Sequence, residues 1–420
     1  MAVAYLAIPF ALILLSAPRL SFYLLILVNY IYAPIILTGL AVHPGDICSV
    51  VFIGSVAISW LLRGNPLIDH TRLDFPFWAL IAATIISGIF AHKPELSLVP
   101  VIRIILIYLA YRAFYSFAES YGASRMTVFY VYALTLFSLF NFIMFLTLGG
   151  TYRVFGVAGI AFETLSMIGV PLTLVCAIWS ETKKKRIFFC ALLSFNVLAA
   201  ISTMSRGLLL TIALSSTIFL WVSYRKAGRM GLEAPRKYIR AFLFFLAPLA
   251  IISIVAWGIF VPVAERFQEI SLDRPMGTIL LRLSLWRAAI DGFLTSPFTG
   301  IGIGNFRMID SLLPYLKFDP VRYYITGMTS HNVFLQYLCE TGIIGAAAFL
   351  WLAYRAFSSA VKIMRQTVSA DELVPSMAAF VGALVIFITA FYMRAWTWGQ
   401  EGFVFAFTLS LVARQYHTVI

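Results

Sequence analysis

The sequence predicts an all-α polytopic membrane protein, with about 12 transmembrane helices and a large extracytoplasmic loop that contains amphipathic helices. Three observations predict this class. Of the 420 residues, 61% are hydrophobic and only 12% are charged. Apolar runs of helical length recur along the whole chain, and short loops that are rich in Lys and Arg separate every second pair of them.

The composition also limits what the chain can bind. A soluble domain is about a quarter charged, so a chain with half that share cannot cover a surface that faces water. The net charge of +13 is dispersed among apolar spans and forms no soluble basic domain, which argues against nucleic acid and in favour of membrane lipid as a partner. The four cysteines show no C-x-x-C spacing, so neither a disulfide framework nor a zinc site is indicated.

Thirteen apolar segments are candidates for membrane helices. The first lacks a basic start and a small-residue cleavage site, so we interpret it as a retained segment and not as a secretory signal. Because the first two segments are hard to separate, residues 1–41 are expected to hold one full crossing and one short or re-entrant piece. The candidate spans lie near residues 3–17, 20–41, 47–62, 75–91, 96–117, 126–148, 163–180, 187–203, 207–223, 241–262, 331–354, 375–393 and 400–413.

The loop charges predict which side is cytoplasmic. Five loops hold 17 Lys and Arg together, whereas the short connections on the other side hold four. By the positive-inside rule, the charged loops and the C-terminus are cytoplasmic. The charged loops are 63–74, 112–125, 181–186, 224–240 and 355–374.

One long connection departs from this pattern. We interpret residues 1–420 as a single integral membrane domain, with residues 263–330 as a large extracytoplasmic loop within it. Six of the seven basic residues in this loop are Arg. A guanidinium offers a fixed charge and a planar fork that suits phosphate oxygens. Pairing with the acidic residues of the same loop is the alternative explanation for many of them.

Arg206 is the first position that could carry chemistry. It stands in Ser205-Arg206-Gly207, at the outer boundary between two apolar spans. A charge at that depth is costly unless it reaches water or a partner. Arg206 is therefore either an interfacial arginine that reaches out to water or part of a site.

The second position lies on a predicted amphipathic helix, residues 278–295, at the membrane interface. Arg282 precedes Trp286 by four residues, so the two share one face, and a cation–π contact between them is the structural alternative to a site. Arg287 and Asp291 form a second pair at the same spacing, which is typical of a structural ion pair.

The third position is the return into the membrane at His331-Asn332. Imidazole can accept a proton near neutral pH, as a general base must, although a histidine at a span boundary is also often a cap. Glu340 follows on the same predicted helix and would be a carboxylate inside the membrane, which requires a partner. Before this helix, three alternate glycines in residues 296–306 permit close backbone approach, without the spacing of a dinucleotide fingerprint.

Several motifs for metals and nucleotides are absent from the sequence. It has no D-x-D pair, no H-E-x-x-H, no P-loop and no nucleophile elbow. We therefore expect no metal site and no cofactor.

Together these motifs resemble the O-antigen ligase / O-antigen polymerase superfamily of bacterial membrane glycosyltransferases. The likeness rests on S-R-G at 205–207, R-x-x-x-W at 282–286, S-P-x-x-G-x-G-x-G-x-F at 296–306, and H-N-x-x-L-Q-x-L-x-E-x-G-x-x-G at 331–345. The order, the spacing and the large outer loop agree with the family over about residues 150–350.

The resemblance implies transfer of a glycan from undecaprenyl diphosphate to lipid A–core oligosaccharide, without a metal, at the periplasmic face of the bacterial inner membrane. A polymerase that extends another lipid-linked glycan is the alternative within the family, and a transporter of lipid-linked glycan is a more distant one. By the resemblance, Arg206 and Arg282 would hold the donor diphosphate, and His331 would assist the acceptor hydroxyl as the third catalytic residue.

Five further residues are candidates for contact with the donor diphosphate or the glycan. They are Arg153, Trp286, Arg287, Asn332 and Glu340. Arg153 stands in an earlier outer loop that resembles the corresponding loop of the family, although the usual Asn-Pro-Asn-like sequence is absent there.

Overall fold

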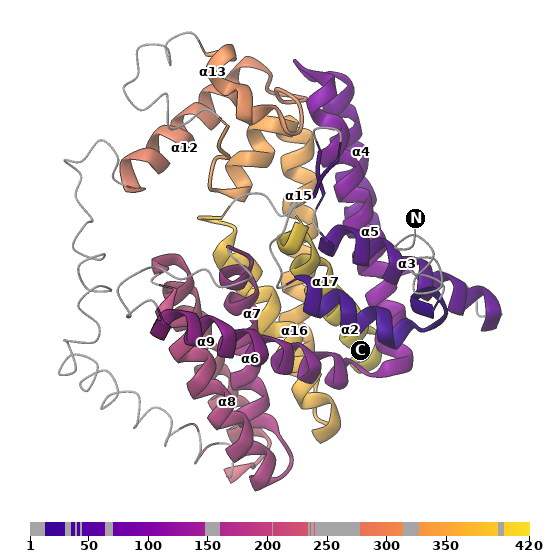
Figure 1. The fold of residues 1–420 in the computed structure, drawn as a ribbon, viewed down its shortest axis with the longest axis vertical. Helices are drawn as coiled ribbons and strands as arrows, with labels where there is room; N and C mark the ends of the chain where they lie inside the picture. The colour runs from indigo at the N-terminus through magenta and orange to yellow at the C-terminus, as the bar shows by residue number, and fades with distance from the viewer. Residues whose placement is uncertain are drawn as a thin grey trace.

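The structure is a computed structural model, and it describes residues 13–29, 35–37, 40–42, 44–63, 70–147, 160–203, 205–233, 236, 239, 278–313, 327–393 and 399–420. These residues are helical apart from connecting turns and one short hairpin, which confirms the predicted class (Figure 1). The elements before the middle of the chain are α2 (Pro18–Asn29), β1 (Ile35–Leu37), β2 (Leu40–Val42), α3 (Pro44–Arg63), α4 (Asp74–Ile89), α5 (Pro94–Tyr121), α6 (Ala123–Thr147) and α7 (Ile160–Trp179). The later ones are α8 (Lys183–Ser202), α9 (Arg206–Arg229), α12 (Thr278–Thr295), η1 (Asn305–Met308), α13 (Ile309–Leu312), α15 (Val333–Gln366), α16 (Ala370–Thr389) and α17 (Gly399–Val419).

Eight helices of the described part are long and apolar enough to cross a bilayer. Two shorter apolar helices, α2 and α4, accompany them. A bilayer core of about 30 Å requires about 20 residues of helix, so the eight alone make this a multi-pass membrane protein. The total of about 12 crossings remains a prediction.

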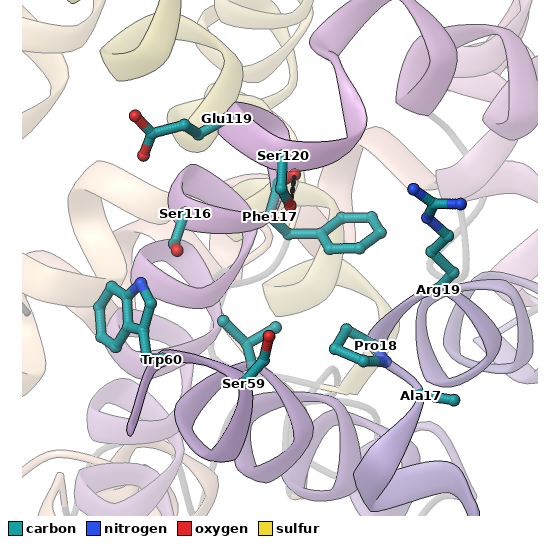
Figure 2. Close-up of a pocket in the computed structure, with 10 residues that line it drawn as sticks. Ala17, Pro18, Arg19, Ser59, Trp60, Ser116, Phe117, Glu119 and Ser120 are labelled. Atoms are coloured by element: carbon teal, nitrogen blue, oxygen red, sulfur yellow. Dashed lines mark hydrogen bonds between the residues drawn. The ribbon is translucent and has the colours of Figure 1, made fainter. Parts of the chain in front are cut away.

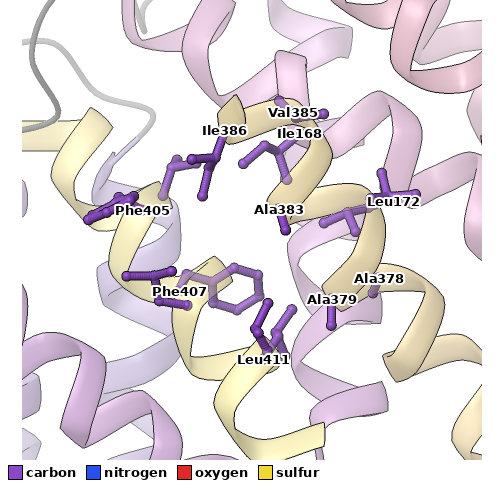
Figure 3. Close-up of a cluster of buried hydrophobic side chains, with 14 of the residues drawn as sticks. Ile168, Leu172, Ala378, Ala379, Ala383, Val385, Ile386, Phe405, Phe407 and Leu411 are labelled. Atoms are coloured by element: carbon purple, nitrogen blue, oxygen red, sulfur yellow. The ribbon is translucent and has the colours of Figure 1, made fainter. Parts of the chain in front are cut away.

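Helix α7 is the centre of the bundle. All of its hydrophobic window is buried, and it contacts α6, α8, α9, α16 and α17. Figure 3 shows Ile168 and Leu172 of α7 facing a row of small residues on α16, with Phe407 and Leu411 of α17 beside them. Small residues let membrane helices approach closely. Close approach stabilises the bundle because van der Waals packing, and not the hydrophobic effect, drives helix association within lipid.

Glycines mark the closest of these approaches. A Cβ added at Gly382 would lie 2.6 Å from Thr408 Cγ2, and one added at Gly169 would lie 2.5 Å from Leu134 Cδ2. Larger side chains at either position would therefore separate α16 from α17, or α7 from α6.

The predicted span at 20–41 is wrong as a continuous helix. Helix α2 ends at Asn29, and Ile35–Leu37 pairs antiparallel with Leu40–Val42. Twelve residues of helix extend only about 18 Å, which agrees with the expected short piece in the first 41 residues. A run of apolar residues alone does not distinguish one helix from a helix followed by a hairpin.

Other boundaries shift by a turn or more. Helix α15 continues to Gln366, well past the predicted end at 354, and it is kinked at Gly342. The predicted span at 241–262 and most of 3–17 lie outside the described residues.

Part of the predicted outer loop folds into helices that pack on the first half of α15. Helix α12 has the predicted bounds 278–295, and in Figure 1 it lies with α13 at the end of the molecule opposite to α8. Leu285, Ala288 and Ala289 of α12 are buried in a small separate core with Phe306 and Cys339. The rest of the predicted loop, 263–277 and 314–326, lies outside the described residues.

The exposed face of α12 is mostly apolar, with Arg287 as its exposed charge. Leu283 is 50% exposed, Ile290 45% and Leu294 64%. An apolar stripe of this kind fits the predicted position at a membrane interface.

Candidate active site around the turn at residues 390–393

Arg206 is the first residue of α9, and Ser205 caps the helix before it. The Ser205 hydroxyl accepts a hydrogen bond from the backbone N–H of Leu208 at 3.5 Å and donates one to Glu163 Oε2 at 3.0 Å. Glu163 is buried in the first turn of α7. The start of α9 is thus joined to the start of α7. The N-terminus of a helix is electropositive, and the Arg206 guanidinium adds a positive charge to it. Together they favour binding of an anion at the start of α9.

Tyr392 lies against this helix start, in the turn that follows α16. Its hydroxyl donates a hydrogen bond to the Gly207 carbonyl at 2.8 Å and contacts the Thr211 hydroxyl. A Cβ at Gly207 would lie only 2.7 Å from Tyr392 Cε2. The glycine of the S-R-G motif therefore makes room for the aromatic ring.

Arg282 approaches the same ring from α12. Its guanidinium carbon lies 5.9 Å from the centroid of Tyr392, within the range of a cation–π contact. Arg282 therefore stacks on Tyr392 and not, as the alternative interpretation expected, on Trp286. Among the described residues, no carboxylate pairs with Arg282.

Burial perturbs both partners of this contact. Burial raises the pKa of Tyr392 to about 12, while the Thr211 hydrogen bond and the charge of Arg282 oppose the rise and Glu163 adds to it. Burial lowers the pKa of the Arg282 guanidinium, and the phenol of Tyr392 opposes that shift. An arginine keeps its proton in proteins, so Arg282 is a partly dehydrated cation that lacks a described counter-ion.

His331 has a left-handed backbone conformation, with φ at 52°. This conformation costs an L-residue roughly 1–2 kcal/mol, so the surrounding contacts must hold it. The Ser330 N–H donates to Gln336 Oε1 at 2.7 Å, and the Ser330 hydroxyl donates to the Asn332 carbonyl at 2.8 Å. Strained positions of this kind cluster at functional sites.

Asn332 connects the His331 segment to the Tyr392 turn. Its side chain accepts from the Leu335 N–H at 3.1 Å, as the N-cap of α15, and donates to the Phe391 carbonyl at 3.2 Å. The next residue, Val333, donates its N–H to the Ala390 carbonyl at 2.8 Å. The turn at 390–393 is therefore the common contact of the three segments that carry Arg206, Arg282 and His331.

Glu340 has a different environment from these residues. It is buried, and its Oε1 accepts a hydrogen bond from the backbone N–H of Phe306 at 3.1 Å. Its own carbonyl accepts from the Gly302 N–H at 3.0 Å and from the Ser87 hydroxyl at 2.6 Å. The carboxylate that required a partner inside the membrane thus finds one in the glycine-rich run.

The glycines of that run serve packing. Gly300 and Gly342 both have positive φ, and a Cβ on either would lie 2.3 Å from backbone atoms of the other segment. The Ile343 N–H donates to the Pro297 carbonyl at 2.9 Å. Gly300 thus packs on the kink of α15, whereas a Cβ at Gly302 would meet Ala91 and one at Gly304 would meet Leu96. Close packing therefore explains all three alternate glycines without a nucleotide.

The other predicted contact residues have mixed placements. Arg287 pairs with Asp291, with its Nε 3.7 Å from Oδ2, as expected of a structural pair. The Trp286 indole N–H is buried and has no hydrogen-bond partner among the described residues. Arg153 lies outside the described residues.

Two residues of this cluster did not follow from the sequence. Tyr392 stands near the outer end of a predicted span, where aromatic residues are common, so nothing distinguished it from an interfacial anchor. Glu163 follows the predicted early arginine loop, and only the fold brings it to Ser205. Within the described ranges, no three His, Cys, Asp or Glu side chains gather as a metal site would require.

Comparison with known proteins agrees with the motifs. Residues 188–350 match the family model described as O-Antigen ligase. This range includes Arg206, Arg282, His331 and Glu340 but ends before Tyr392. No curated protein matches the chain. The chain thus carries, over residues 188–350, the domain of the O-antigen ligase / O-antigen polymerase superfamily, as its motifs predicted.

Proposed function

We propose that this protein transfers a glycan from undecaprenyl diphosphate to lipid A–core oligosaccharide, at the periplasmic face of the bacterial inner membrane. The observation that carries the proposal is Arg282, a partly buried guanidinium that stacks on Tyr392 and pairs with no described carboxylate. A dehydrated cation of this kind binds an anion more strongly than an exposed one does. A diphosphate would supply the missing negative charge.

The arginines act on the leaving group in this mechanism. The bond between the anomeric carbon and the diphosphate oxygen breaks, and its electron pair stays on the diphosphate. Arg282 and Arg206, together with the N-terminus of α9, stabilise the charge that develops there. Guanidinium groups present planar donors to phosphate oxygens, so no metal is required for this step.

His331 acts on the acceptor. The acceptor hydroxyl oxygen forms the new bond to the anomeric carbon, and its proton moves to the neutral imidazole. Direct displacement inverts the configuration at that carbon. The strained backbone of His331, held through Ser330 and Asn332, fixes the direction in which its side chain leaves the main chain.

The remaining predicted residues have supporting roles. An unmatched buried donor such as the Trp286 indole is costly, so Trp286 is the best of the candidates for a hydrogen bond to the glycan. Asn332 positions His331, and Glu340 holds the glycine-rich run against α15. Contacts of Arg153 and Arg287 with the substrate stay predictions.

A polymerase of the same superfamily is the second candidate, because only the acceptor would differ. A transporter is less favoured. Arg103 and Glu340 are charges within predicted spans and would be the best candidates for a transport site. Both have partners in the protein, since Arg103 Nη2 lies 3.9 Å from Asp46 Oδ2 and Glu340 is hydrogen-bonded to Phe306. The charged groups of a transport site would instead be expected to lie near the midplane of the membrane and to pair with the substrate.

One assay separates these functions. Purified protein receives a lipid-linked glycan donor and lipid A–core acceptor, with no nucleotide and with excess chelator. Ligated product supports the proposal, and lengthening of the lipid-linked glycan without ligation identifies a polymerase. Absence of both products would refute transfer chemistry.

Variants then test the site. Arg282→Ala and His331→Ala should abolish transfer while the proteins remain inserted and folded. Arg282→Lys should also be impaired, because an ammonium lacks the planar fork. Arg229→Gln is the matched control, since Arg229 is exposed at the opposite end of the helix that begins with Arg206. Normal turnover by both alanine variants would overturn the site.

A further inference from the structure

A cavity lies at the far end of the bundle from the transfer site. Its volume is about 440 Å³, and it is lined by residues from the turn before α4, from α5, from α15 and from the end of α17. Its lining residue on α15, Ser359, lies up to about 39 Å along the helix from Val333, at 1.5 Å per residue. The cavity is thus separated from the site at the 390–393 turn by most of a membrane thickness.

Three of the eleven residues that line this cavity have basic side chains, among a lining that is otherwise largely apolar. His70, Arg72 and His417 line it, and none of the lining side chains is a carboxylate. The Arg72 guanidinium carbon lies 4.6 Å from the centroid of the Tyr416 ring, and the Lys362 ammonium donates to the Tyr416 hydroxyl at 3.3 Å. Two cations thus converge on one tyrosine.

The buried carboxylate of Asp74, next in the chain to the lining residue Leu73, does not neutralise these cations. Asp74 accepts hydrogen bonds from Arg112 Nη1 at 2.9 Å and from the Thr71 N–H at 2.7 Å. Among the described residues, neither Arg72 nor Lys362 forms an ion pair. An anion in the cavity would reduce the repulsion between them.

A buried hydroxyl also lines this cavity without a partner. Ser359 is 2% exposed, and its Oγ forms no hydrogen bond within the part of the chain that the structure describes. A buried polar group in this state is unfavourable unless a ligand or water satisfies it. The positive-inside rule accounts for the number of basic residues at this end, but it does not account for this hydroxyl.

A neighbouring cavity of about 350 Å³ lacks these features. Figure 2 shows Arg19 on one side of it and Glu119 and Trp60 on the other. Glu119 lies among its lining residues and pairs with Arg414 at 3.6 Å. Of these two cavities, only the one lined by Arg72 and Ser359 combines basic side chains with a buried hydroxyl that has no hydrogen-bond partner among the described residues.

We propose that the cavity around Arg72, Ser359 and His417 binds a phosphate-bearing anion. The guanidinium and imidazoles supply charge-assisted donors, and Ser359 supplies a hydroxyl at the buried end. Tyr115 lies about 9 Å before the end of α5, and Ser359 about 10 Å before the end of α15. This depth corresponds to the headgroup region, so an anionic phospholipid is the first source to test and free phosphate is the second.

The inference does not depend on glycan transfer, because the test measures binding alone. The full-length protein is placed in nanodiscs of phosphatidylcholine, with and without phosphatidylglycerol, and its Tm and retained lipids are measured. A third arm adds inorganic phosphate to the phosphatidylcholine sample. Phosphatidylglycerol should raise Tm and remain bound, whereas stabilisation by inorganic phosphate alone identifies free phosphate as the ligand.

Variants decide whether the cavity is responsible. Arg72→Gln and Ser359→Leu should each raise the Kd of the stabilising ligand about tenfold. The first variant removes a positive charge, and the second fills space in the cavity. Lys184→Gln is the control, because it removes one exposed charge from a loop predicted on the same face. Arg72 is exposed, so Arg72→Gln gives an answer even if Ser359→Leu does not fold. No stabilisation by either anion, or equal loss in the Lys184 variant, overturns the proposal.

Discussion

Replacement of Tyr392 tests how the site is assembled. Tyr392→Phe keeps the ring beneath Arg282 and removes the hydroxyl that bonds to the Gly207 carbonyl and contacts Thr211. Tyr392→Leu removes the ring as well. The two variants therefore separate the tie between the turn and α9 from the contact that orients Arg282.

The expected magnitudes follow from the contacts. A neutral hydrogen bond contributes about 0.5–1.5 kcal/mol net, and the fully buried Thr211 hydroxyl would lose its tyrosine partner. Tyr392→Phe should therefore lower the free energy of unfolding by about 1–3 kcal/mol. Loss of the cation–π contact in Tyr392→Leu adds roughly 0.5–2 kcal/mol, and it should reduce transfer far more than Tyr392→Phe does, because Arg282 is no longer positioned.

Thermal unfolding in detergent and the transfer assay measure the two effects. Tyr354→Phe is the matched control, because Tyr354 is 69% exposed on α15. If the Arg282→Ala variant is inactive but the Tyr392→Leu variant transfers glycan normally, the positioning role of Tyr392 is refuted. Unchanged stability of Tyr392→Phe would refute the hydrogen-bond argument.

Three further predictions concern the support of the site. Glu340→Ala should lower the free energy of unfolding by about 2–4 kcal/mol, because the buried Phe306 N–H loses its acceptor. Glu340→Gln keeps an acceptor oxygen and should cost less. The Tm values of the two variants measure the difference. Gly300→Ala should cost about 3 kcal/mol or more, because its Cβ would meet the Glu340 backbone at 2.3 Å. Gly122→Ala, which has a positive φ but open space around its Cβ, should cost less, and similar yields of folded protein would contradict this. The pKa of Tyr392 rises on folding from about 10 to about 12, so its contribution to stability is complete below pH 10 and is lost as the pH rises towards 12. The wild-type Tm should therefore fall more steeply over this window than that of Tyr392→Phe, and parallel curves would contradict the shift.

Much of the architecture could be predicted from local sequence. Hydropathy indicated the membrane class and most of the helices, and the i,i+4 spacing predicted α12 and the Arg287–Asp291 pair. These features depend on neighbours within one or two turns, which the sequence displays directly. The hairpin at 35–42 was missed because an apolar run has no feature that marks a reversal of the chain.

The candidate site was predictable only in part. Arg206, Arg282 and His331 stood out because charge and imidazole at a membrane boundary are unusual. Tyr392 did not stand out, since its partners Gly207 and Thr211 are more than 180 residues away in the chain. The role of Glu340 also changed with the fold, from an isolated carboxylate to the acceptor for the Phe306 N–H.

The sequence by itself determined that this chain is a membrane protein, where most of its helices lie and which superfamily its central region resembles. Composition, periodicity and motifs are properties of neighbouring residues, so the sequence displays them directly. Only the tertiary structure decided which side chains meet. The packing of α9, α12 and α15 against the turn at 390–393 depends on close contacts between distant segments, and such contacts arise from complementary shape at positions that no local pattern connects.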